Sequence, residues 1–271
     1  MGSYFDHDGL RMHYHDTGSD GLPFLFQHGL GGDVGQTTGL FHPPPGIRLL
    51  SLDSRGHGNS DVGDSEKIGF DVFADDVCAL LDRLEVARAV VGGISMGAGV
   101  ALNLAVRHAA RVRGLVLSRP AWLDQPLPGH LTVYLRIADL IRLCGPDRGL
   151  AIFTDSDEFM TIRDESPDSA ASLVKQFEHP RAEEAIVRLD RIPRDVPCRD
   201  RRGVANIDTP TLVLGNRRDP IHPFSYAEDF ARLIRGATLD ELTPKSVDLN
   251  QHAADTQRYI ESFLQERILA C

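Results

Sequence analysis

Short apolar runs alternate with turns and helical stretches over the first 118 residues. Short segments between turns predict strands at residues 11–16, 23–27, 47–52, 87–91 and 112–117, and the last four are mostly apolar. Apolar residues at helical spacing predict helices over residues 70–84 and 97–108. Alternation of strands and helices favours a parallel sheet that is covered by helices on both faces.

The alternation stops after Ser118 and returns at residue 211. Residues from about 119 to 204 carry helical patches but no clear buried strand, and residues 155–202 are rich in charge. Strands then follow at 211–215 and near 238–242, with helices near 224–233 and 255–267. We therefore predict a core of residues 1–119 and 205–271, interrupted by a helical cap over residues 120–204.

Composition limits the class of protein and its partners. The 271 residues are 42% hydrophobic and 25% charged, which is ordinary for a globular protein. The formal net charge of −10 opposes binding to nucleic acid and to anionic membranes. We read no signal peptide at the N-terminus and no apolar run of membrane-spanning length, so a cytoplasmic protein is expected.

Four widely spaced cysteines, none in a C-x-x-C pair, give no support for a zinc site or a redox pair. We expect no metal and no cofactor. The oligomeric state stays open, with a homodimer among the options.

The motif at residues 93–97 indicates a catalytic role rather than a structural one. Gly93-Ile94-Ser95-Met96-Gly97 lies directly after a predicted strand and directly before a predicted helix. This G-x-S-x-G pattern is typical of a tight turn that holds a nucleophilic serine above a sheet. Glycines on either side avoid clashes in that turn. The start of the helix favours negative charge. We therefore predict that Ser95 is a nucleophile.

A serine hydroxyl needs a base, and the base needs an orienting acid. The chain order expected with such an elbow is serine, acid, histidine. Asp219 follows the strand at 211–215, at the rim where the elbow lies, so we predict it to be the acid. Among the later histidines we choose His252, which we place in a loop before the last helix. His222 lies so close to Asp219 that we assign it to the loop of the acid.

Two backbone N–H groups should stabilise the oxyanion. We expect them at Met96, which follows the nucleophile, and at Leu30, in the glycine-rich loop at 28–32. His28 in that loop is expected to brace it rather than act as a base. The second glycine-rich loop, residues 53–60, is expected to be a turn held by side-chain hydrogen bonds.

These motifs together resemble the α/β-hydrolase superfamily. The resemblance rests on H-G-x-G-G at 28–32, D-x-R-G-H-G-x-S at 53–60, the elbow at 93–97 and D-x-x-x-P at 219–223. It implies an α/β fold with an eight-stranded, mostly parallel sheet, a metal-free triad and a variable helical cap. The chain looks most like small bacterial esterases and enol-lactone hydrolases. It departs from many relatives at His252, which Gln251 rather than glycine precedes.

The expected reaction is cleavage of a small or medium carboxylic ester or lactone through an acyl-enzyme. Residues at the start of the cap are candidates for an apolar pocket: Trp122, Leu123, Leu127, Leu131, Tyr134 and Leu135. The same triad could instead cleave a carbon–carbon bond, act on thioesters, transfer an acyl group or support a cofactor-free peroxidase. A receptor that binds a ligand and turns it over slowly is a further alternative.

Overall fold

A computed structural model describes residues 2–184 and 186–270. Eight strands form one sheet in the order β1-β2-β4-β3-β5-β6-β7-β8. The pairs β1–β2 and β2–β4 are antiparallel, and the others are parallel. The strands are β1 (Ser3–His7), β2 (Leu10–Asp16), β3 (Leu22–Gln27), β4 (Ile47–Leu52), β5 (Ala89–Ile94), β6 (Val112–Ser118), β7 (Thr211–Gly215) and β8 (Thr238–Glu241). The predicted α/β sheet is confirmed.

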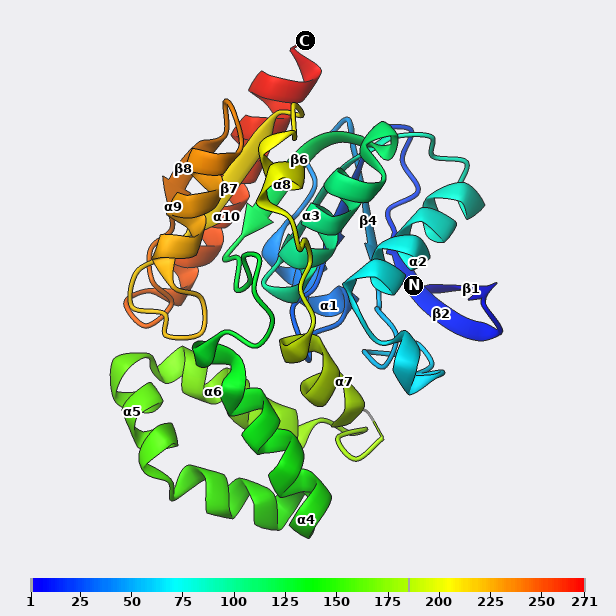
Figure 1. Cartoon of the computed structure of the whole chain (residues 1–271). Coiled ribbons are helices and arrows are strands. Elements are labelled where there is room, and N and C mark those ends of the chain that lie inside the picture. Colours follow the sequence, from blue (N-terminus) through cyan, green and yellow to red (C-terminus); the bar gives the residue numbers. More distant parts are fainter. Residues whose placement is uncertain (1, 185, 271) are drawn as a thin grey trace.

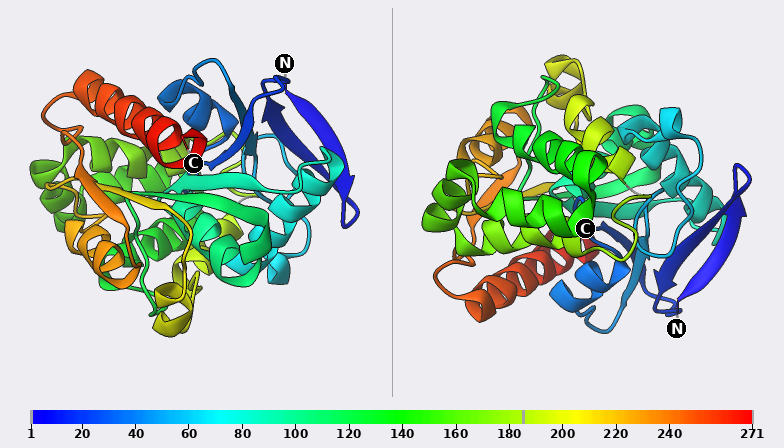
Figure 2. Two further views of the ribbon diagram at one scale, coloured as in Figure 1. Left: turned by 90° about the horizontal axis from the view of Figure 1, so that it is seen from above. Right: turned by 90° about the horizontal axis from the view of Figure 1, so that it is seen from below.

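Helices cover both faces of the sheet (Figures 1 and 2). One face carries α2 (Phe70–Arg83), α3 (Met96–Arg107), α8 (Arg201–Ala205) and α9 (Phe224–Leu233), and the other carries α1 (Val34–Leu40) and α10 (Leu249–Phe263). A six-residue π-helical turn, Leu264–Leu269, extends α10. Strand β5 is buried along its whole length, as a central parallel strand must be when helices cover both faces.

The segment between β6 and β7 forms a group of helices that stands apart from the sheet in Figure 1. It contains α4 (Thr132–Thr154), α5 (Asp157–Glu165), α6 (Pro167–Glu178) and α7 (Ile186–Arg191). A non-helical Gly145 followed by Pro146 kinks α4. The short helix α8, which overlaps the end of the predicted cap, lies with the core against α3 and α9.

Three local predictions were wrong. The N-terminal strand β1 was missed, and so was α1, whose N-cap Asp33 accepts a hydrogen bond from Gly35 N–H. The last helix starts at Leu249 rather than near residue 255, and Asp248 caps it by accepting from Gln251 N–H. His252 therefore lies in the first turn of a helix, and its backbone N–H donates to Asp248 O at 3.0 Å.

Candidate active site

The turn between β5 and α3 holds Ser95 in a strained conformation. Ser95 has φ 56° and ψ −112°, and its N–H donates to Ser118 O at 2.9 Å. A Cβ at Gly93 would lie 2.2 Å from the Gly97 backbone, and one at Gly97 would lie 2.3 Å from Gln27 O. Close backbone approach thus requires both glycines of the motif.

The imidazole beside Ser95 belongs to His222. Its Nε2 lies 2.9 Å from Ser95 Oγ, and its Nδ1 lies 3.0 Å from each carboxylate oxygen of Asp219. All three side chains are largely buried. A hydroxyl, an imidazole and a carboxylate in sequence can move a proton from the hydroxyl and stabilise the imidazolium that forms.

His252 does not reach this position, so the choice of His252 as the base is corrected here. Its Nδ1 lies 2.8 Å from Thr243 O, and the residue is buried in the first turn of α10. Burial, together with the charges of Arg119 and Lys245, lowers the pKa of His252 to about 4, so the ring is neutral. The prediction failed because it assumed a loop at residue 252 and separate loops for acid and base. The structure instead places acid and imidazole three residues apart in one loop.

Asp219 is held by the backbone of its own loop and by an arginine. Its Oδ1 accepts from the N–H groups of Ile221 and His222 at 3.2 and 3.1 Å. Burial raises the pKa of Asp219, but the charge of Arg119 and the contacts with His222 outweigh burial and hold the pKa well below its usual value. The carboxylate is therefore ionised when it faces the imidazole.

Arg119 was missed by the sequence analysis. Its Nε and Nη2 donate to Asp219 Oδ2 at 3.0 and 2.6 Å, and the pair is almost fully buried. Nη2 also lies 3.1 Å from His222 Nδ1. Because Nδ1 faces both oxygens of the ionised Asp219, we assign it the proton, which it donates to Asp219, and Nε2 is then free to accept from Ser95. The approach of Arg119 Nη2 to Nδ1 is then a contact between two donors and not a hydrogen bond. The position directly after β6, at the carboxyl end of a strand, was the available signal.

The loop at 28–32 presents backbone donors near the serine. Gly29 N–H donates to Gln36 Oε1 at 2.7 Å, and Gly32 N–H donates to Gly29 O at 2.9 Å. Within the described residues, no partner is recorded for the N–H groups of Leu30 and Met96. Leu30 lines the cavity together with Ser95, and Met96 follows Ser95 in the elbow.

His28, in the loop at 28–32, makes the bracing contacts that were expected. His28 Nδ1 lies 2.8 Å from Gly29 O, and its Nε2 accepts from Ser54 N–H at 3.1 Å.

In the 53–60 loop, Asp53 accepts from Val34 and Asn59 N–H groups, and Arg55 pairs with buried Asp76. These side-chain hydrogen bonds confirm a braced turn.

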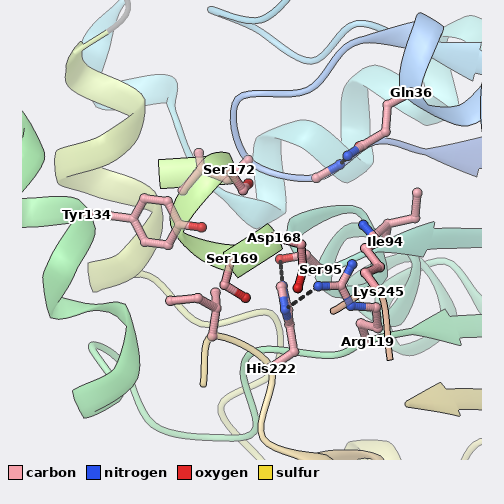
Figure 3. A pocket seen from close by; sticks show the side chains of 13 residues that line it. Gln36, Ile94, Ser95, Arg119, Tyr134, Asp168, Ser169, Ser172, His222 and Lys245 are labelled. Atoms are coloured by element: carbon pink, nitrogen blue, oxygen red, sulfur yellow. Dashed lines mark hydrogen bonds between the residues drawn. The ribbon is translucent and has the colours of Figure 1, made fainter. Parts of the chain in front are cut away.

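A cavity of about 60 Å³ lies over Ser95, with walls from the core and from the cap (Figure 3). Tyr134 of α4 and Asp168, Ser169 and Ser172 of α6 face it from the cap. Ser169 Oγ donates to Asp219 Oδ1 at 3.4 Å. The pocket is therefore more polar than the predicted apolar wall.

Of the pocket residues in the prediction, Tyr134 alone lies in this wall. Trp122 packs edge-on against Phe70 of α2 at a centroid distance of 5.2 Å, and both Trp122 and Leu131 are almost fully buried in the apolar core. Leu127 donates its N–H to Pro193 O. None of these three residues lines the cavity over Ser95.

Lys245, in the loop after β8, was also missed. It borders the same cavity beside Arg119. The charge of Arg119 and burial lower the pKa of Lys245 to about 7. Its position after the last strand, on the rim that carries Ser95, was the signal that sequence reasoning could have used.

Three features together define a known class of enzyme: a strand-turn-helix elbow, a serine that is hydrogen-bonded to an imidazole, and a mostly parallel sheet. Residues 23–247 match the family model of the alpha/beta hydrolase fold, so the chain belongs to that family and is an α/β-hydrolase. It is similar to the AB hydrolase superfamily protein YisY of Bacillus subtilis (strain 168), at 30% identity over 83% of each chain.

Two further similar proteins differ in the activities that their names state. A 2-hydroxymuconate semialdehyde hydrolase of Pseudomonas sp. (strain CF600) is 28% identical over 85% of this chain and 82% of the relative. The crystal structure of the enol-lactonase from Burkholderia xenovorans LB400 superposes with a TM-score of 0.75 at 24% identity, over 97% of this chain and all of that one. The likeness to the enol-lactonase structure concerns the fold alone.

Among the helices of the described residues, none combines the length and the apolar character that a membrane span requires.

Proposed function

We propose that this α/β-hydrolase cleaves a small carboxylic ester or lactone, with Ser95 as nucleophile, His222 as general base and Asp219 as the orienting acid. The observation that carries the proposal is the hydrogen-bond path from Ser95 Oγ through His222 to Asp219. This assignment keeps the predicted nucleophile and acid and replaces the predicted base.

The reaction follows from these contacts. Ser95 Oγ attacks the carbonyl carbon while its proton passes to His222 Nε2, and the ionised Asp219 stabilises the imidazolium. The N–H groups of Leu30 and Met96 stabilise the oxyanion. Collapse expels the alcohol, which takes the proton from His222. Water, deprotonated by the same imidazole, then attacks the acyl-enzyme and releases the acid and free Ser95.

A fluorophosphonate probe tests the nucleophile directly. It is expected to modify Ser95, as mapped by peptide mass spectrometry, and Ser95→Ala protein should stay unlabelled. Because the probe needs an activated hydroxyl, His222→Asn should slow the labelling. Modification of a different residue, or equal labelling of the alanine variant, would contradict the assignment. A series of nitrophenyl esters of increasing chain length then measures the preferred acyl size.

The pH profile gives a second test, on a neutral ester. Burial and the charge of Arg119 lower the pKa of His222, against the raising effect of Asp219. Only the neutral imidazole can act as base, so kcat/KM is expected to be flat above this pKa and to fall as pH decreases through it. The midpoint should lie below 6.5. Fluorescence of buried Trp122 checks that the fold persists at each pH, and a midpoint above 6.5 would contradict the assignment.

Carbon–carbon bond hydrolysis is the second candidate. It is supported by the similarity to a protein whose name gives 2-hydroxymuconate semialdehyde as its substrate. Esters, thioesters and β-diketones with matched acyl groups separate the two reactions by their relative kcat/KM. Faster turnover of the diketone than of the ester would favour carbon–carbon cleavage.

A further inference from the structure

A second cavity lies beside the one over Ser95. It has a volume of about 290 Å³, and Figure 2 shows the helices α1 and α10 that border it side by side. Gln36, Ile94 and Lys245 line both cavities. The cavity over Ser95 is small for any substrate, whereas the two volumes together reach the range of roughly 300–1,000 Å³ found for small-molecule sites.

The lining of the second cavity contains a lysine but no acidic side chain. Its lining is Gln36, Gly39, Leu40, Ile94, Lys245, Leu249, Asn250, His252 and Ala253. This set contains no Asp or Glu, and His252 is neutral. Among the described residues of this lining, Lys245 is therefore the one side chain that carries a charge as pH falls through about 7, within a protein whose net charge is −10. The amides of Gln36 and Asn250 add donors that suit an anion.

Lys245 has no partner of its own. Among residues 2–184 and 186–270, no hydrogen bond or ion pair is recorded for its ammonium group, although Asp168 lines the same cavity. Asp168 accepts instead from Ser166 Oγ at 2.8 Å. The other nearby cation, Arg119, is committed to Asp219 through two of its nitrogens. A half-buried, unpaired ammonium next to a reactive serine is costly unless a ligand compensates it.

We propose that the cavity between α1 and α10 binds the acidic end of the substrate, and that Lys245 recognises its carboxylate. The inference rests on the proposed function, and it specifies the substrate class as an ester or lactone that carries a free acid group. The reacting carbonyl lies over Ser95, and the acid group lies at the boundary of the two cavities.

Lys245→Met removes the charge and keeps the apolar stem of the side chain. The substrates are 4-nitrophenyl hydrogen glutarate and its neutral counterpart of equal chain length, 4-nitrophenyl valerate. The ratio of kcat/KM for the anionic to the neutral ester is expected to fall by about 10–100-fold, the range contributed by a hydrogen bond to a charged group. The loss should appear mainly in KM for the anionic ester. An unchanged ratio, or equal losses on both esters, would overturn the proposal.

The pH dependence of that ratio provides a readout that a structural role would not move. Charged and titratable groups face Lys245 from four segments: Arg119 after β6, Asp168 and Lys175 on α6, Asp219 and His222 after β7, and His252 on α10. With these neighbours the pKa of Lys245 is about 7. The ratio should therefore decrease as pH rises through about 7. Lys245→Arg stays charged, so its ratio should be flat over the same range.

A binding measurement separates this proposal from the proposed function. Calorimetry with 4-nitrophenyl hydrogen glutarate uses Ser95→Ala protein, which should bind the ester without cleaving it. Adding Lys245→Met should weaken binding by the same 10–100-fold. Equal binding with and without the lysine would overturn the anion site. If the ester binds through Lys245 but wild-type protein does not cleave it, the anion site stands and the proposed reaction is wrong.

Discussion

Replacing His222 by Asn is expected to lower kcat/KM for 4-nitrophenyl butyrate by about 10²–10⁴-fold, the contribution of a positioned general base. The asparagine amide can still donate to Asp219, as His222 Nδ1 does, but it has no atom in place of Nε2. The hydroxyl of Ser95 then loses its proton acceptor while the loop keeps its contact with the acid. Steady-state kinetics at a pH above the pKa of His222 measures the effect.

The matched control is the same substitution at the other candidate. His252→Asn keeps a donor for Thr243 O, which is the recorded contact of the His252 ring. The loss at residue 222 should exceed the loss at residue 252 by at least about tenfold, with both variants folded by circular dichroism. If His252→Asn lost the larger factor, the imidazole at 252 would have to reach Ser95 during turnover, and the assignment of His222 would fail.

Arg119→Met is expected to lower the free energy of unfolding by about 3–5 kcal/mol. Two nitrogens of Arg119 donate to one carboxylate oxygen of Asp219, at 2.6 and 3.0 Å, and the pair has almost no exposure to solvent. Removing one partner of a buried pair leaves the other charge uncompensated, which costs more than the pair itself contributes. Urea denaturation followed by circular dichroism measures the change.

An exposed arginine of the cap supplies the comparison. Arg142 pairs with Asp139 and Asp190, and about half of its side chain is exposed. Water screens such pairs, so Arg142→Met should change the free energy of unfolding by about 1 kcal/mol or less. Arg119→Lys should fall between the two, because it keeps the charge but loses the fork of donors. Equal effects of the two methionine substitutions would contradict the importance of burial for the Arg119–Asp219 pair.

The lining of the cavity over Ser95 is more polar than the sequence predicted. An apolar wall from the start of the cap was predicted, yet Trp122 and Leu131 are buried in the apolar core and do not line the cavity. An amphipathic pattern indicates that the apolar face of a helix is buried, but it does not indicate which residues bury it. The cap helices pack against one another, α4 against α6 and α7, and α6 presents Asp168, Ser169 and Ser172 to the cavity over the serine.

The sequence alone predicted seven of the eight strands, a sheet covered by helices on both faces, and the elbow at Ser95, although it missed β1 and α1. Strand and helix periods are local properties, and the two glycines of the elbow are required by backbone contacts within a few ångströms. The positions of Ser95 and Asp219 at strand ends follow from the same rule, because carboxyl ends of parallel strands share one rim.

Tertiary structure decided which side chains meet at that rim. Whether His222 or His252 reaches Ser95 depends on where α10 begins and on how the loop after β7 turns, and chain order carries neither. Arg119, Lys245 and the cavity between α1 and α10 bring together segments that are a hundred or more residues apart. A strand end places Arg119 and Lys245 at the rim, but the packing of the whole domain sets which atoms they meet there.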